Sequence, residues 1–327
     1  MSKQAADWKK ILLGMPLVDG ALQWMRSHTM PGFRGVRLYD VAQFLYQESQ
    51  RNDLNTRASA MTYHFFLALF PSLISLFTLT AYLPRELDFY SALEQALQSI
   101  LPPGAKDYVI HDLIAQLRPR AQSGLLSIGF VLAIYFGSEG ILAMMRGFDK
   151  TYNSSFRKRN WLETRFTAFA LTIALGGLLI LSILSIIFGE KILRLMLDYL
   201  QWGGLVKLAI KSLNYLITLV LFYAVISLVY RFGPALYKPI RGLSPGALFA
   251  TLASIGTSVL FGMFIQSYST YHKVYGAISA LIITLVWMRI NTMILLLGFE
   301  LNAAVAVNRD LMDANQIARR KQQAEDE

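Results

Sequence analysis

Six long apolar stretches constrain this chain more than any other feature of its sequence. Each has about the 20 residues that a helix needs to cross the hydrocarbon core of a bilayer. They lie near residues 59–81, 125–145, 166–188, 213–230, 246–267 and 277–300. The third, FTAFALTIALGGLLILSILSIIF, contains no charged side chain. The pattern predicts a bundle of helices that crosses a membrane.

The composition agrees with this interpretation. Hydrophobic residues make up 54% of the chain and charged residues only 16%, whereas about a quarter of a soluble domain is charged. We therefore predict an all-α integral membrane protein built as a six-transmembrane-helix bundle. The absence of cysteine excludes disulfides and thiolate metal sites.

The distribution of basic residues predicts the orientation of the bundle. Most of the 31 Lys and Arg residues precede the first stretch, follow the sixth, or lie in the second and fourth connections. Basic residues are retained on the cytoplasmic side of membrane proteins, so both termini are expected to be cytoplasmic. This bias also explains the net charge of +10, and we expect no nucleic-acid partner.

The chain divides into three predicted regions. Residues 1–57 form a cytoplasmic amphipathic segment, in which an amphipathic helix over 38–52 leads into the first span. Residues 58–307 form the membrane domain. Residues 308–327 form a charged cytoplasmic tail, which we expect to be frayed because chain ends with few contacts are poorly ordered.

Two further segments show helical patterns outside the spans. Residues 82–124 are expected to form two short helices, separated by PPG, as a small helical cap on the outer face. The apolar ILLGMPLV near the start has the length of a signal-peptide core, but no small-residue cleavage site follows. We expect it to lie as an amphipathic segment near the membrane surface.

Three titratable residues from different spans fall in one layer near the cytoplasmic boundary. Glu139 and His64 lie about 10 Å deep and Arg289 about 12 Å deep, from the helical rise of 1.5 Å per residue. An unpaired charge there costs about 2.5–3.5 kcal/mol, so we expect Glu139 and Arg289 to pair, with His64 and Tyr135 nearby. A structural salt bridge, a polar cavity that water or substrate enters, and snorkelling to the interface all stay open.

The sixth span carries further polar residues. Asn291 and Asn302 are eleven residues apart and therefore share a helical face. Glu300 lies near the expected head groups, where we predict that it pairs with a basic loop residue or caps a helix end. Together Asn291, Glu300 and Asn302 form a candidate polar face toward the bundle interior.

Small residues at helical spacing predict close packing of the spans, because they let two backbones approach. The fifth span has Gly246, Ala250, Ser254, Ser258 and Gly262, and the second has Gly129, Ala133, Gly137 and Gly140. These stripes are expected to pack within one bundle, with a homo-oligomer interface as the alternative. Pro71 removes a backbone hydrogen bond in the middle of the first span and is expected to kink it.

Residues for catalysis are not evident in the sequence. The four histidines, His28, His64, His111 and His272, have no metal-ligand spacing. The chain has no Gly-rich phosphate loop followed by Lys and no Gly-x-Ser-x-Gly elbow. We therefore expect no metal, no cofactor and no enzymatic activity.

Several segments together resemble the YihY/virulence factor BrkB family. The resemblance extends over about residues 38–307. It is carried by RASAMTYHFFLALFPSLISL at 57–76, GSEGILAMMRGFDKTYN at 137–153, VYRFGP at 229–234, SPGALFATL at 244–252, YSTYHKVYGAISALIITLVWM at 268–288 and LLLGFELNAAV at 295–305. The family's common aromatic after TY is His64 in this chain.

The resemblance implies a multi-pass protein of the bacterial cell inner (cytoplasmic) membrane. The family once carried the label ribonuclease BN, but metal-dependent nucleases need clustered His and Asp ligands, which this sequence does not show. Two functions stay open: a transporter or flippase of a lipid or other amphiphilic envelope component, and a non-transporting scaffold or envelope assembly factor. Membrane lipids are the expected partners.

Overall fold

The structure is a computed structural model, and it describes most of the chain. The described residues are 16–29, 32, 33, 35–51, 54–80, 82, 91, 94, 123–148, 155–200, 204–238, 244–267 and 277–325. Among these residues the secondary structure is helical, apart from one isolated β-bridge between Phe156 and Leu236. The predicted all-α class is confirmed for this part of the chain.

Eight helices are described, and each predicted span coincides with one of them. The helices are α2 (Pro16–Ser27), α3 (Leu38–Arg51), α4 (Leu54–Thr80), α7 (Ser123–Phe148), α8 (Trp161–Leu200), α9 (Gly204–Phe232), α10 (Pro245–Ser267) and α12 (Ala277–Glu325). Helix α3 matches the amphipathic helix that the sequence predicts before the first span.

Five of these helices are long and apolar enough to cross a membrane. Their candidate spans are Leu54–Leu79, Ser127–Phe148, Trp161–Ser185, Pro245–Ile265 and Leu281–Met312. The fourth predicted span lies on α9, whose apolar segment Leu216–Phe232 is shorter than a full span. The chain is thus a multi-pass helical membrane protein, whereas the number six stays a prediction.

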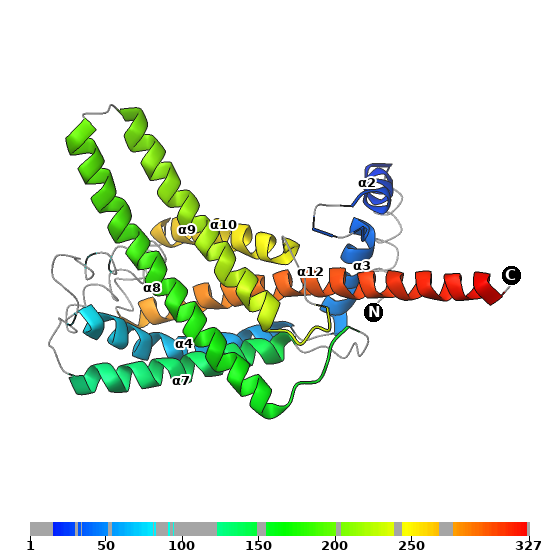
Figure 1. Ribbon diagram of the computed structural model, residues 1–327, viewed down its shortest axis with the longest axis horizontal. Helices are drawn as coiled ribbons and strands as arrows, with labels where there is room; N and C mark the ends of the chain where they lie inside the picture. Colours follow the sequence, from blue (N-terminus) through cyan, green and yellow to red (C-terminus); the bar gives the residue numbers. More distant parts are fainter. Residues whose placement is uncertain are drawn as a thin grey trace.

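The membrane helices run alternately in opposite directions (Figure 1). As a result, the starts of α4, α8 and α10 lie at the same end of the bundle as the ends of α7 and α9. We call this the proximal end. The distribution of basic residues predicts that it faces the cytoplasm, and that orientation stays a prediction.

Helices α8 and α12 are much longer than the predicted spans. They contain 40 and 49 residues, which correspond to about 60 and 74 Å, against a hydrocarbon core of about 30 Å. The expectation of a frayed tail is wrong, because α12 continues to Glu325 and projects beyond the bundle (Figure 1). The tail is rich in Ala, Gln, Arg, Lys and Glu, which favour helix without any apolar pattern.

A large buried hydrophobic cluster of the described residues lies at the proximal end. Helix α4 packs along α7, α10 packs along α12, and α8 and α9 form a helical hairpin that leans away from α4 and α7 (Figure 1). Helix α3 packs on α12, where Val41 of α3 and Val36 just before it lie in one buried cluster with Ala304 and Val305. The predicted cap over 82–124 lies outside the described residues, except for three isolated positions and the first two residues of α7.

Candidate functional site

A cluster of buried aromatic side chains holds the proximal end together. Phe148 at the end of α7 stacks on Phe299 of α12, with ring centroids 4.1 Å apart. Tyr230 of α9 meets Phe148 edge-on at 5.8 Å, and Phe156 meets Phe299 edge-on at 6.5 Å. Phe148, Tyr230 and Phe299 belong to three of the segments that resemble the BrkB family, so these three segments meet in space although they are far apart in sequence.

The start of α10 is buried and capped by side chains. The hydroxyl of Ser244 accepts a hydrogen bond from the backbone N–H of Ala247 at 3.2 Å, the usual N-cap arrangement. The side chain of Asn302 accepts from the N–H of Gly246 at 2.9 Å and donates to Ser244 at 2.8 Å. Tyr223 accepts from the N–H of Ser244 at 3.0 Å. These side chains satisfy backbone donors that would otherwise be buried without partners.

The variant Asn302→Ala is expected to destabilise the protein by about 1–3 kcal/mol, because it leaves the N–H of Gly246 and the hydroxyl of Ser244 without their buried partner. Unfolding titrations with SDS in mixed micelles measure this loss. Asn308→Ala is a matched control, since Asn308 is only half-buried and bonds a carbonyl of its own helix. Equal losses for the two variants would contradict the capping role.

Helices α10 and α12 approach each other backbone to backbone. A Cβ added to Gly246 would overlap the carbonyl oxygen of Gly298 and reach within 2.7 Å of the Asn302 side chain. A Cβ added to Gly298 would lie 2.6 Å from the Tyr230 hydroxyl and 2.9 Å from the Cβ of Ala250. At both positions a larger residue has no room for its side chain, so only glycine allows the two helices to approach this closely.

The small residues of α10 face α12 within the chain. Ala250, Ser254 and Gly262 are buried, and the half-buried Ser258 accepts a hydrogen bond from the indole of Trp287 at 3.1 Å. The exposed face of the same helix is apolar. The stripe is thus used inside one subunit.

The small residues of α7 do not form one stripe, contrary to the sequence prediction. A Cβ on Gly129 would contact Ile74 of α4, and one on Gly140 would overlap the ring of Phe65, also on α4. A Cβ on Gly137 instead lies 3.0 Å from Thr172 of α8. Ala133 is half-buried. A four-residue spacing rotates slowly around a helix of 3.6 residues per turn, so the stripe drifts from one neighbour to the next.

Glu300 of α12 is buried at the proximal end, near α4 and the end of α7. Its side chain is 2% exposed, and its carboxylate lies 4.0 Å from the guanidinium of Arg57 on α4. Arg57 also donates to the carbonyl of Gly147 near the end of α7 at 3.0 Å. Arg57 therefore connects α4, α7 and α12. Glu300 contacts α4 and Asn302 contacts α10. The polar residues of α12 therefore contact two different helices and do not form a single face.

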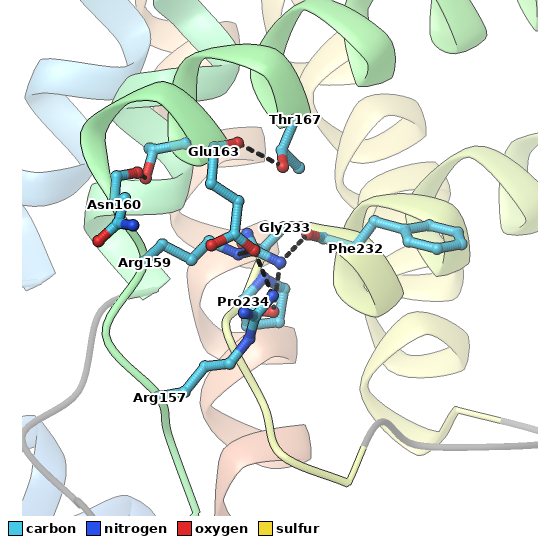
Figure 2. A network of polar contacts seen from close by, with 9 residues as sticks. Arg157, Arg159, Asn160, Glu163, Thr167, Phe232, Gly233 and Pro234 are labelled. Carbon is cyan, nitrogen blue, oxygen red and sulfur yellow. Dashed lines mark hydrogen bonds and ion pairs between the residues drawn. The ribbon is translucent and has the colours of Figure 1, made fainter.

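A second arginine caps the end of α9 (Figure 2). The guanidinium of Arg159 donates to the carbonyls of Phe232, Gly233 and Pro234 at 3.0, 2.8 and 3.4 Å. Basic side chains stabilise helix C-termini in this way. Glu163, on the first turn of α8, pairs with Arg159 at 3.7 Å and also with Arg157. The connection into α8 is thereby fastened to the end of α9.

The segment before α8 and the segment after α9 are also joined by backbone hydrogen bonds. The N–H of Arg157 donates to Ala235, and the N–H of Tyr237 donates to Ser155, at 2.8 and 3.1 Å. The hydroxyl of Ser155 donates to Asp310 of α12 at 2.7 Å. The continuation of α12 past the predicted span is therefore part of the proximal end.

The structure pairs Glu139 with Arg165 of α8, so the predicted pair with Arg289 is wrong. The Glu139 and Arg165 side chains are 17% and 30% exposed, and the Arg165 guanidinium lies 6.0 Å from the ring centroid of Trp161. Arg165 is four residues into α8, about 6 Å from its start. The ion pair thus lies near the predicted cytoplasmic boundary and is partly exposed.

The other members of the predicted polar layer lie elsewhere. Arg289 is exposed and donates to Ser59 and Asn55 of α4. Tyr135 is also exposed, and His64 is half-buried with its ring against Tyr63. Asn291, from the predicted polar face of the sixth span, donates its side-chain N–H to a carbonyl of its own helix. The structure therefore does not gather Glu139, Arg289, His64 and Tyr135 into one site.

Sequence reasoning missed Arg165 because hydropathy placed the start of the third span after it. The helix begins at Trp161, directly after Asn160, a residue type that favours helix N-caps. The backbone carbonyl of Asn160 accepts from the N–H of Thr164 at 3.0 Å. This start signal would have put Arg165 on the helix and within reach of α7.

Pro71 lies within α4, which is helical from Leu54 to Thr80. The next residue, Ser72, donates its hydroxyl to the carbonyl of Ala68 at 2.7 Å. Among the described residues, no group of three or more His, Cys, Asp or Glu side chains is placed to hold a metal ion. The polar groups that the structure does gather are ion pairs and helix caps.

These features define a multi-pass helical membrane protein whose helices are joined at the proximal end by aromatic packing, ion pairs and helix caps. The family described as virulence factor BrkB matches residues 45–325. The chain therefore belongs to the virulence factor BrkB family, as the sequence resemblance predicts.

Curated relatives agree with this assignment. YfkH of Bacillus subtilis (strain 168), which is named a ribonuclease-like protein, is 28% identical over 272 residues, covering 83% of this chain and 97% of YfkH. A UPF0761 membrane protein of Histophilus somni (strain 2336) is 26% identical, covering 86% of this chain and 95% of that protein. One of Tolumonas auensis is 26% identical and covers 82% and 87%. No solved structure matches the chain.

Proposed function

We propose that the protein is a non-enzymatic transporter or flippase of the bacterial inner membrane, which moves a lipid or another amphiphilic envelope component. The observation that carries this proposal is the ion pair between Glu139 and Arg165. It joins two membrane helices, and both side chains are partly exposed beside apolar helix faces. Charged groups within membrane spans are functional candidates, because a position of this kind is costly to maintain.

The arrangement of α8 supports the proposal. Near its start the helix packs on α7 through Arg165 and through the contact between Thr172 and Gly137, and further along it leans away from α7 with α9 (Figure 1). A polar head group could therefore meet Arg165 at the junction, while its chains stay in contact with the bilayer. An amphiphile is the class of substrate that needs both kinds of surface.

Proteoliposomes with fluorescent phospholipids test the proposal. A membrane-impermeant reductant destroys label in the outer leaflet, so label lost from the inner leaflet measures translocation, with and without a proton or sodium gradient. The wild-type protein is expected to accelerate this loss, and Arg165→Gln to slow it about tenfold, equivalent to about 1.4 kcal/mol. Arg231→Gln is the matched control, because Arg231 is an exposed cation at the same end and should leave the rate unchanged.

Swapping the two charges separates function from architecture. The double variant Glu139→Arg with Arg165→Glu keeps the ion pair but moves the cation to α7. A purely structural pair predicts that both stability and translocation recover relative to the single variants. A pair that receives a head group predicts recovery of stability alone.

The alternative function is a non-transporting scaffold or envelope assembly factor. It is favoured by the polar network of the proximal end, where Arg159 fastens α8 to α9 and Ser155 bonds α12. Hydrogen bonds of this kind between distant segments favour a rigid structure, as a scaffold requires. If the wild-type protein moves no envelope lipid or ion in proteoliposomes, transport is contradicted and the scaffold is the better explanation. Incubation with labelled RNA tests the absence of ribonuclease activity.

A further inference from the structure

The first three turns of α8 present an unusually exposed apolar surface. Trp161, Leu162 and Phe166 are 70%, 73% and 76% exposed. Phe169 and Ile173 continue the same side of the helix further into the membrane and are also exposed. We call these five residues the α8 strip. Its tryptophan lies where the helix leaves the predicted cytoplasmic boundary, the depth at which tryptophan is enriched in membrane proteins.

Two cations accompany the α8 strip. Arg165 lies between Leu162 and Phe166, with its partly exposed guanidinium above the ring of Trp161. Lys158 is exposed in the connection just before the helix. A surface with cations at the boundary and aromatic and aliphatic side chains below matches a phospholipid that carries a negative head group. A neutral amphiphile would use only the apolar half of this surface.

We propose that Lys158, Arg165 and the α8 strip bind an anionic glycerophospholipid. Its phosphate lies between the Lys158 ammonium and the Arg165 guanidinium, and its acyl chains lie along Phe166, Phe169 and Ile173. The inference rests on the proposed function, because it names the class of amphiphile that the protein handles. Each basic residue near an anionic membrane surface contributes about 1 kcal/mol, or about a fivefold change in affinity.

Glu139 controls how strongly the site binds. Its carboxylate occupies one side of the Arg165 guanidinium, which has five N–H donors and can therefore contact a phosphate at the same time. The carboxylate lowers the positive potential that the phosphate meets. Removal of its charge should accordingly strengthen lipid binding, whereas removal of either cation should weaken it. A purely structural ion pair predicts no such opposite signs.

Titration of the purified full-length protein with dioleoyl phosphatidylglycerol, followed by native mass spectrometry, tests the site. We expect phosphatidylglycerol to bind at least about fivefold more tightly than dioleoyl phosphatidylcholine. Lys158→Gln should weaken phosphatidylglycerol binding about fivefold, and Glu139→Gln should strengthen it about fivefold. Arg231→Gln is again the control and should change nothing. Millimolar inorganic phosphate should not displace the lipid, since it lacks the acyl chains.

Equal binding of the two lipids would overturn the inference, and so would equal effects of Lys158→Gln and Arg231→Gln. If Arg165→Gln fails to fold, Lys158→Gln and Glu139→Gln still decide, because Lys158 is an exposed loop residue. The binding measurement is independent of translocation. Selective binding without translocation contradicts only the proposed transport, and translocation without a preference for phosphatidylglycerol contradicts only this site.

Discussion

The variant Gly246→Ala is expected to destabilise the protein by about 3 kcal/mol, the upper part of the usual range for overpacking. The added methyl group would overlap the carbonyl oxygen of Gly298 and lie within 2.7 Å of the Asn302 side chain. The main obstacle is backbone and cannot rotate away, so α10 must move off α12 and lose the cap that Asn302 provides. SDS unfolding titrations measure the loss in free energy.

Gly256→Ala is the matched control for this prediction. Gly256 lies on the same helix, but no heavy atom lies within 4 Å of the position that its Cβ would take. The change should stay within about 0.5 kcal/mol, or stabilise slightly because alanine favours helix over glycine. Equal effects at the two glycines would show that α10 and α12 do not approach as the structure has them.

The variant Arg57→Met is expected to cost about 3–5 kcal/mol, the usual loss when removal of one partner leaves the other charge buried. Glu300 is 2% exposed, so its carboxylate would remain buried without this cation. The carbonyl of Gly147 would also lose its donor. The same unfolding titration measures the effect, and the loss should depend only weakly on salt because partly buried pairs are screened less than exposed ones.

Two further variants complete this test. Adding Glu300→Gln to Arg57→Met should recover much of the lost stability, because the buried group is then neutral. Arg157→Met removes the cation from an exposed pair, in which both side chains are about 40% accessible, and should cost no more than about 1 kcal/mol. An Arg57 variant as mild as the Arg157 variant would show that the pair with Glu300 is not significant for folding.

The positions of the spans could be predicted because hydropathy is a local property. Each predicted span lies on one helix, and α3 coincides with the predicted amphipathic helix. Helix ends were harder to predict. Hydropathy detects where a helix leaves the membrane but not where it stops, so the continuation of α8 to Leu200 and of α12 to Glu325 was missed.

The partners of the charged residues could not be predicted from depth alone. Glu139 and Arg289 lie at similar expected depths, yet the partner of Glu139 is Arg165. Depth gives one coordinate of a residue, whereas an ion pair also requires two helices to be neighbours and to face each other. Arg159 shows the same limit, since its carbonyl partners lie more than 70 residues away in sequence.

The sequence by itself determined that this chain is a helical membrane protein of the BrkB family, because apolar length and local motifs are properties of continuous segments. Only the tertiary structure decided which residues meet: Glu139 with Arg165, Arg57 with Glu300, and Gly246 with Gly298. Lipid is as apolar as the helix surfaces, so the choice of neighbour depends on close packing and a few polar contacts between distant segments. Such contacts have no periodic signature along the chain.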